Sequence, residues 1–297
     1  MSNAVARRTF LTTAAAATAA GAFGAPSRAQ HRTIEVGDVA LECTFSGLGI
    51  PVVLLANAGC SVGYFDYLAG MLATRGFQAV SINIRGVAGS RGSLDDGTTL
   101  HDLAGDVAGV IEAIGSGPAH LVGHAFGNRI ARCLAVDQPP LVRSVTLLAA
   151  GGLVGPSTPV GAPFRNAKQA KMNGSDCVTV LGARWLSPAS DPKILAQVEC
   201  WPAVFLAHLA TGQGMPLEDW WGAGTAPLLV IQGLDDVAAP PGNGHALREK
   251  HGDRVQLVDL PRAGHFMLLE QPEAVTRAVA EFVGAGVGPR GRAPSKP

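Results

Sequence analysis

The stretch Gly123-His124-Ala125-Phe126-Gly127 has the spacing of a turn that presents one side chain for chemistry. An apolar run precedes it and a helical pattern follows it, which is the layout of a G-x-S-x-G nucleophile elbow. The flanking glycines are needed because a Cβ at either position would collide with the neighbouring strand or helix. Such a turn lifts its central side chain above the carboxyl end of a sheet, where backbone N–H groups can hold an anion.

The central residue of this turn is Ala125, where the pattern has a serine. A methyl group has neither a hydroxyl to attack a substrate nor a proton to give up. The sequence therefore predicts an elbow without its nucleophile.

Strand and helix patterns alternate on both sides of this turn, which predicts an α/β fold. The sheet is expected to be mostly parallel, opened by an antiparallel hairpin and covered by helices on both faces. The expected strands are two within 33–46 around Gly37-Asp38, then 51–56, 78–84, 119–122, 142–148, 228–232 and 254–260. The expected helices are 64–75, one that opens at a Thr99–Asp102 capping box, 126–134, 242–251 and 273–283.

The alternation stops between residues 155 and 227, where Pro, Gly and Ser are frequent and all four tryptophans fall. We interpret 155–227 as an inserted, mainly helical cap over the carboxyl edge of the sheet. Most of the tryptophans are expected to pack inside the cap, and one or two to face a substrate. The core is then expected at 30–154 and 228–285, with a disordered tail at 286–297.

Residues 1–29 have the order of a secretory signal, with a charged start, an apolar stretch and small residues at a cleavage site. Their Arg7-Arg8-x-Phe10-Leu11 run resembles a twin-arginine signal. We therefore expect a bacterial protein that uses the twin-arginine export machinery and is periplasmic or secreted, with no stable membrane span once mature. In an oxidising compartment Cys177 and Cys200 could pair.

The overall charge is balanced, with 23 basic and 23 acidic residues, so no broad basic face for nucleic acid is expected. The five cysteines include no C-x-x-C pair, which argues against a zinc ribbon or a thioredoxin-type redox pair. We predict a small-molecule substrate, no cofactor and no metal.

The order of elbow, cap, Gly233–Pro240 turn and Gly264-His265 turn resembles the α/β-hydrolase superfamily over residues 33–283. The resemblance implies that Asp236 is the acid of the site, with Asp235 the fallback, and that His265 is the base. A buried carboxylate next to a histidine fixes its tautomer and stabilises the imidazolium.

The resemblance also implies an oxyanion hole. Its first donor is the N–H that follows the nucleophile position, here Phe126, and the second is assigned to the N–H of Ala58. Asn57 is a neighbour of that donor. Candidate pocket residues are Asn57, Cys60, Trp220 and Trp221.

The remaining polar candidates are expected to be structural. His124 is assigned to packing or hydrogen bonding beneath the turn, and Arg85 and Ser90 to the turn after a central strand. Four other histidines have no motif around them and are expected on the surface: His101, His208, His245 and His251.

Three explanations of Ala125 are open. In the first, the alanine is natural and the His265–Asp236 dyad activates water or a substrate proton. In the second, the alanine marks an inactivated serine esterase. In the third, the protein is a non-catalytic ligand-binding member of the fold. We favour the first, and the aminoacrylate-hydrolase branch is similar in having Gly-His-Ala-x-Gly. The expected function is then hydrolysis of a small, largely apolar ester, lactone or amide-like substrate.

Overall fold

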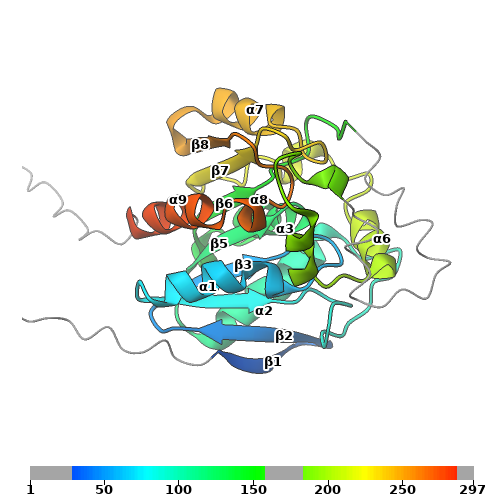
Figure 1. Cartoon of the computed structure of the whole chain (residues 1–297). Coiled ribbons are helices and arrows are strands. Elements are labelled where there is room, and N and C mark those ends of the chain that lie inside the picture. Colours follow the sequence, from blue (N-terminus) through cyan, green and yellow to red (C-terminus); the bar gives the residue numbers. More distant parts are fainter. Residues whose placement is uncertain (1–28, 158–182, 286–297) are drawn as a thin grey trace, which may run out of the picture.

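The computed structural model of the chain describes residues 29–157 and 183–285 (Figure 1). The expected signal peptide, apart from residue 29, and the expected tail at 286–297 lie outside the described residues, as does Cys177.

The described strands form one eight-stranded sheet in the order β1-β2-β4-β3-β5-β6-β7-β8. The strands β1 and β2 form an antiparallel hairpin and β2 pairs antiparallel with β4, while every later pairing is parallel. The strands are β1 (Gln30–Val36), β2 (Val39–Ser46), β3 (Ile50–Leu55), β4 (Phe77–Ile82), β5 (Ala119–His124), β6 (Val142–Leu148), β7 (Leu228–Gly233) and β8 (Val255–Leu260). The predicted mostly parallel sheet with an antiparallel start is confirmed.

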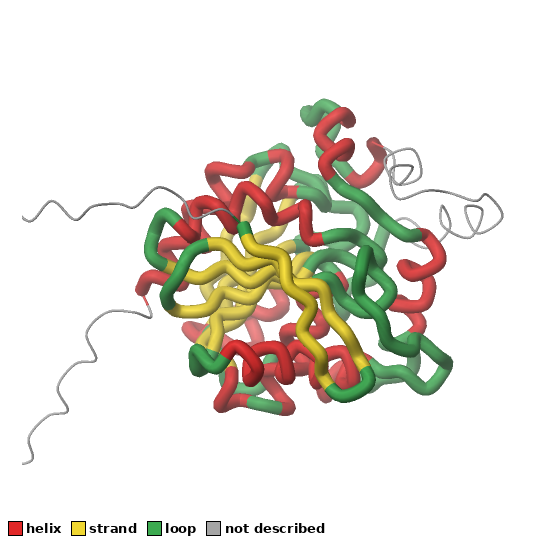
Figure 2. The backbone as a smooth tube through the Cα atoms, turned by 90° about the horizontal axis from the view of Figure 1, so that it is seen from below, coloured by secondary structure: helices red, strands yellow, loops and turns green. Residues whose placement is uncertain are grey.

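Helices lie on both faces of this sheet, as the two views of Figures 1 and 2 show. Helices α1 and α9 contact each other, and α2 and α3 contact each other. The α-helices are α1 (Asp66–Ala73), α2 (Leu100–Ile114), α3 (Phe126–Asp137), α6 (Pro202–Ala210), α7 (Gly242–His251), α8 (Met267–Glu270) and α9 (Pro272–Ala285). The short 3-10 helices are η1 (Val62–Phe65), η2 (Pro139–Leu141), η4 (Ala183–Trp185), η5 (Pro192–Gln197), η6 (Leu217–Asp219) and η7 (Gly252–Arg254). No helix in the described part of the chain has the length and apolar character that crossing a bilayer requires.

Local sequence signals account for the β1–β2 hairpin and for the start of α2. Gly37, in the tight turn between β1 and β2, has a φ of 61°, which glycine adopts without strain. Thr99 and Asp102 form the predicted capping box, each side chain bonding to the other's backbone N–H. The one-turn helix α8, directly after the His265 turn, is an element that the sequence pattern did not predict.

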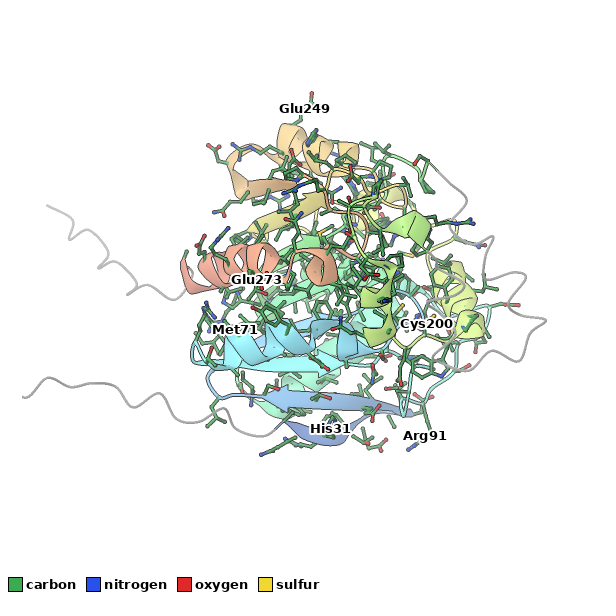
Figure 3. The ribbon with its side chains drawn as sticks, in the orientation of Figure 1. His31, Met71, Arg91, Cys200, Glu249 and Glu273 are labelled. Carbon is green, nitrogen blue, oxygen red and sulfur yellow. The ribbon has the colours of Figure 1, made fainter. Side chains whose placement is uncertain are left out.

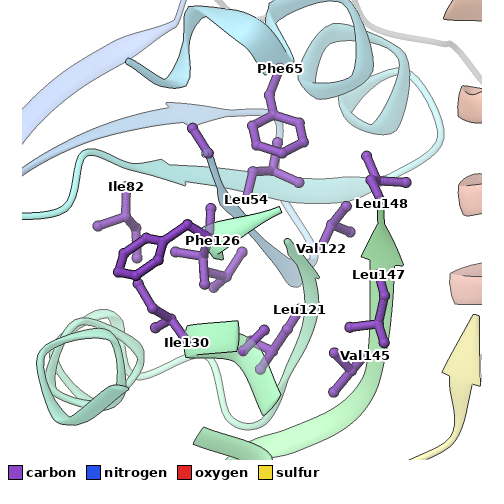
Figure 4. Close-up of a cluster of buried hydrophobic side chains, with 14 of the residues drawn as sticks. Leu54, Phe65, Ile82, Leu121, Val122, Phe126, Ile130, Val145, Leu147 and Leu148 are labelled. Carbon is purple, nitrogen blue, oxygen red and sulfur yellow. The ribbon is translucent and has the colours of Figure 1, made fainter. Parts of the chain in front are cut away.

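A cluster of buried apolar side chains lies between α3 and the central strands (Figure 4). Leu54 of β3, Val122 of β5 and Leu147 of β6 are fully buried, and Phe126 and Ile130 of α3 pack in the same cluster. Both faces of these strands are covered, which explains why their sequences are continuous apolar runs.

The described part of the predicted cap, 183–227, contains η4, η5, α6 and η6 and lies over loops that follow the strands. A Cβ on Gly59, in the loop after β3, would lie 2.6 Å from the backbone N of Phe205 in α6. A Cβ on Gly264, in the turn after β8, would lie 2.6 Å from the backbone of Trp185. These segments therefore close over the carboxyl edge of the sheet, while the cap's boundaries stay a prediction.

The two elbow glycines are sites of backbone contact, as the sequence predicted. A Cβ on Gly123 would overlap the backbone of Gly127 and Asn128, and one on Gly127 would overlap the carbonyl of Leu55 in β3. Only backbone atoms surround these positions, so a larger residue would have to separate α3 from the sheet.

Gly127→Ala is expected to lower the free energy of unfolding by about 3 kcal/mol, because overpacking against backbone cannot relax by a side-chain rotation. Gly105→Ala in α2 is the matched control, since a Cβ there meets nothing within 4 Å. The control should stabilise the protein by about 0.5–1 kcal/mol, because alanine favours a helix over glycine. Equal unfolding midpoints in denaturant for the two variants would contradict the crowding at Gly127.

Candidate active site

The turn at Ala125 has the geometry of a strained elbow. Ala125 has φ 50° and ψ −104°, a conformation that costs a non-glycine residue about 1–3 kcal/mol. Its N–H donates to the Leu148 carbonyl at 2.9 Å, and its own carbonyl accepts from the Asn128 N–H at 3.2 Å. Backbone contacts to β6 and α3 therefore hold the turn although no serine is present.

Asp236 and His265 form a buried pair, as the sequence predicted. The imidazole Nδ1–H donates to Asp236 Oδ2 at 2.9 Å, and Oδ1 lies at 3.1 Å. Asp236 Oδ1 also accepts from the N–H groups of Ala238 and Ala239, both at 2.8 Å. With Nδ1 committed to the carboxylate, a neutral His265 has the lone pair of Nε2 available for a proton.

The fallback acid, Asp235, points to another partner. Its carboxylate accepts from Ser187 Oγ at 2.6 Å, which ties the turn after β7 to the segment after η4. Asp236 is therefore the carboxylate that the structure brings to His265.

The turn that carries His265 is anchored at several points. The His265 N–H donates to the Trp185 carbonyl at 2.7 Å. The Glu270 carboxylate accepts from the N–H of Gly264 at 2.9 Å and from the N–H of Ser187 at 2.8 Å. The acidic residue of α8 therefore holds the histidine turn against the described cap segment.

His124 has a packing and hydrogen-bonding role, as predicted, but the turn that it bonds to is the one at His265 and not the elbow. Its Nε2–H donates to the His265 carbonyl at 2.8 Å, and its ring stacks on Tyr64 with centroids 4.3 Å apart. Burial, and then the neighbouring His265, hold the pKa of His124 well below its usual value. A histidine held neutral in this way supports structure and does not act as the base.

The prediction that His208 is a surface group is wrong. His208 is buried in α6, where Nδ1 accepts from the Gly59 N–H at 3.1 Å and Nε2–H donates to the Arg85 carbonyl at 2.9 Å. Its ring stacks on Phe126 at 4.9 Å, and burial lowers its pKa to about 4. A neutral imidazole therefore connects the cap helix to the loop after β3, a role that depends on neighbours distant in sequence.

The other motif-free histidines lie nearer the surface. His101 and His245 are exposed or half-buried and pair with Asp137 at 2.6 Å and Asp259 at 2.9 Å. His251 is half-buried and packs near Trp221 with ring centroids 5.8 Å apart.

Arg85 and Ser90 have the structural roles that the sequence predicted. The Arg85 guanidinium donates to both Asp106 oxygens, at 2.6 and 2.8 Å. Ser90 Oγ donates to the Asn83 carbonyl at 2.7 Å. Both contacts fix the loop after β4.

The two predicted oxyanion donors converge on one atom, the side-chain oxygen of Asn57. Asn57 Oδ1 accepts from the Ala58 N–H at 2.8 Å and from the Phe126 N–H at 3.4 Å. The backbone of β3's loop and the start of α3 thus form a two-donor site, and the Asn57 amide oxygen fills it. A substrate oxygen that uses these donors has to displace this amide oxygen.

The elbow and the dyad open onto one cavity of about 130 Å³. Asn57, Ala125, Phe126 and His265 all line it, so the structure brings these predicted site residues together. Asp236 lies behind His265, with its carboxylate buried. The cap contributes a tryptophan as expected, but this is Trp185.

The remaining pocket candidates do not line this cavity. Trp220 packs its ring over Arg132, 4.6 Å from the guanidinium, and Trp221 lies under the amine of Lys250. Cys60 is buried, and burial raises the pKa of its thiol to about 12, which disfavours the thiolate needed for nucleophilic attack. The prediction of these three residues as pocket lining is wrong.

The structure adds lining residues that the sequence pattern did not single out. Phe205 and Leu209 come from α6, and Arg129 comes from α3. Arg129 follows Phe126 by three residues, and this helical spacing is a signal that could have placed it on the cavity side.

The cysteine prediction is tested only in part. Cys200, on the described cap segment in Figure 3, is disulfide-bonded, whereas Cys43, Cys60 and Cys133 are free thiols. The pairing with Cys177 stays a prediction because that residue lies outside the described ranges. In residues 29–157 and 183–285, no group of three or more His, Cys, Asp or Glu side chains is arranged to hold a metal ion.

Comparison with known proteins finds a family whose model matches most of this chain. The model of the alpha/beta hydrolase family matches residues 52–278. A protein of Variovorax paradoxus proposed to be a carbamate hydrolase is 26% identical, over 79% of this chain and 92% of its own. The 2-(acetamidomethylene)succinate hydrolase of Mesorhizobium japonicum is 24% identical, over 86% of this chain and 95% of its own.

A solved structure shares the fold. The enol-lactonase from Burkholderia xenovorans superposes with a TM-score of 0.72 at 20% identity, and the match covers 85% of this chain and all of that chain.

Asn57→Ala is expected to strengthen the binding of a small alkylboronic acid, whose hydroxide adduct mimics a tetrahedral oxyanion, by about threefold to tenfold. The two N–H donors would then no longer be held by a side-chain oxygen, and a neutral hydrogen bond contributes about 1 kcal/mol. Asn57→Asp is the opposing control, because a carboxylate would occupy the donors more strongly. Calorimetric titration that finds weaker binding for Asn57→Ala would show instead that Asn57 shapes the loop.

Proposed function

The chain belongs to the alpha/beta hydrolase family, and we propose that it is a hydrolase in which the His265–Asp236 dyad activates water without a serine nucleophile. The observation that carries this proposal is the buried dyad facing the same cavity as the strained Ala125 turn. Its substrate is a small, largely apolar ester, lactone or amide-like compound.

The dyad supplies the proton transfers of hydrolysis. His265 Nε2 takes a proton from water as the water oxygen attacks the substrate carbonyl carbon, and Asp236 stabilises the resulting imidazolium. The same Nε2–H then donates its proton to the leaving oxygen or nitrogen as that bond breaks. These steps consume one water and regenerate the dyad, so they need no cofactor.

The methyl group of Ala125 leaves space for this water. A serine hydroxyl would project from the same turn into the cavity, whereas the partly exposed methyl group of Ala125 does not reach as far. Water in this space would be positioned between His265 and the substrate carbonyl, which is the requirement for general-base catalysis.

The oxyanion that forms is stabilised by the N–H groups of Phe126 and Ala58 once the Asn57 side chain turns away. These donors belong to backbone that is fixed by packing, so little reorganisation accompanies charge development. The displaced amide is then close enough to contact the substrate from the cavity wall.

The relatives support this range of substrates. One relative is named for hydrolysis of an acetamido compound, and the enol-lactonase is named for a lactone. Ester, lactone and amide hydrolysis share the attack on a carbonyl carbon that the dyad and the oxyanion donors serve.

In a panel of short aryl esters, lactones and amides, the purified protein is expected to hydrolyse at least one compound. His265→Ala should lower kcat by about 10²–10⁴-fold, the range of a general base. Asp236→Asn should also lower kcat, because the amide no longer stabilises the imidazolium. Ala125→Ser should give no gain in rate and take up no phosphonate label.

Two other outcomes would overturn the water mechanism. Activity and labelling that arise only with Ala125→Ser would identify the frame of a serine esterase whose nucleophile has been lost. Absence of turnover in every variant, with ligand binding retained, would identify a binding protein.

We also propose that the protein is exported through the twin-arginine pathway, which the Arg7-Arg8-x-Phe10-Leu11 run supports. Replacing both arginines with lysine should leave the full-length protein in the cytoplasm, as immunoblots of cell fractions would show. Lysine keeps the charge of the segment, so export of the double variant at the original level would contradict this pathway.

A further inference from the structure

Arg129 brings a positive charge to the wall of the active-site cavity. It lies on α3 three residues after Phe126, so these two residues share one face of the helix, and both line the cavity together with Ala125. No aspartate or glutamate is among the described lining residues. The cavity therefore holds a permanent cation close to the reaction centre.

The Arg129 guanidinium makes no hydrogen bond or ion pair with any described residue. Its one aromatic contact in that part of the chain is with Trp220, whose ring centre lies 5.6 Å away. Burial lowers the pKa of Arg129, which reflects the cost of keeping an unpaired cation in a partly dry site.

The neighbouring arginine shows how this helix satisfies a guanidinium that has only a structural role. Arg132 donates to the Asn128 side chain at 2.6 Å and to the carbonyls of Gly151 at 2.9 Å and Trp221 at 3.3 Å. Arg129, one turn earlier on the helix, has no hydrogen bond of this kind to residues 29–157 or 183–285. Compared with Arg132, the guanidinium N–H groups of Arg129 are therefore available to bind a group that enters the cavity.

Two glycines lie beside the Arg129 guanidinium, and one of them, Gly151, also lines the cavity. A Cβ built on Gly151 would lie 4.0 Å from one guanidinium nitrogen, and one on Gly212 would lie 3.8 Å from another. Both distances are ordinary van der Waals contacts, so two residues without side chains lie next to the guanidinium. The cavity is small, about 130 Å³, which suits a compact planar anion.

We propose that Arg129 binds a carboxylate of the substrate, so that the enzyme selects small esters or amides that carry a free carboxylate. This inference rests on the proposed hydrolase function and narrows its substrate class. A guanidinium fits a carboxylate with two parallel hydrogen bonds, and apolar walls around the pair strengthen them. The scissile carbonyl would then lie toward His265 and the oxyanion donors.

The first test compares two substrates, the monoethyl ester of a short dicarboxylic acid and an uncharged ethyl ester of the same length. We expect kcat/KM to favour the carboxylate ester by about 10- to 100-fold, the effect of charge-assisted hydrogen bonds. Arg129→Met should abolish this preference and Arg129→Lys should restore part of it. The surface control Arg91→Met, beyond the β1–β2 edge in Figure 3, should leave the preference intact.

Stability separates a binding role from a structural one. Removing a half-buried charge that has no hydrogen bond or ion pair with a described residue should leave the melting temperature of Arg129→Met unchanged or higher. A clear drop in melting temperature would indicate a structural arginine and count against the proposal.

A binding measurement distinguishes failure of this inference from failure of the proposed function. Calorimetry with succinate and its neutral diamide in the His265→Ala background is expected to show binding of succinate alone, lost in the His265→Ala/Arg129→Met double variant. Such binding without turnover in any variant would remove the hydrolase function and keep the carboxylate site. Hydrolysis with no preference for the carboxylate ester and no Arg129-dependent binding of succinate would overturn the inference and leave the hydrolase function standing.

Discussion

The packing of the first turn of α3 against β3 is the constraint on which the site depends. A Cβ on Gly127 would overlap the carbonyl of Leu55, so α3 approaches β3 this closely only with glycine there, and the turn from β5 into the helix places Ala125 at a positive φ. The same approach brings the Phe126 N–H next to the loop after β3, where Asn57 and Ala58 lie. It also turns Arg129 toward the cavity. One backbone contact thus positions the elbow, the oxyanion donors and the cation together.

The fold and the Asp236–His265 pair were predictable because their signals are local. Continuous apolar runs mark the buried strands, and short motifs at strand ends place Ala125, Asp236 and His265 before any tertiary information is used. Those residues do meet at one cavity. The proline-led helix α9 and the capping box of α2 were predictable for the same reason, since each depends on the order of a few neighbouring residues.

The residues whose roles were not predicted have roles that depend on contacts with residues distant in the sequence. His208 has no motif, and only its contacts with Gly59 and Arg85 make it a buried connector. Asn57 lines the cavity, as predicted. Its side-chain oxygen accepts from two backbone N–H groups only in one rotamer, and no local sequence pattern predicts that rotamer. Trp220 and Trp221 pack outside the cavity because η6 ends beside α3 and α7, a placement that composition alone does not give.

The strained alanine also has a consequence for how this enzyme can change over generations. Every alanine codon differs from a serine codon by one base, and the backbone at Ala125 already has the dihedral angles that an elbow requires. A single point mutation would therefore place a hydroxyl beside the histidine without any remodelling of the fold. One nucleotide therefore separates the alanine from a serine, whereas backbone hydrogen bonds hold the dihedral angles of the turn and do not depend on which of the two residues is present.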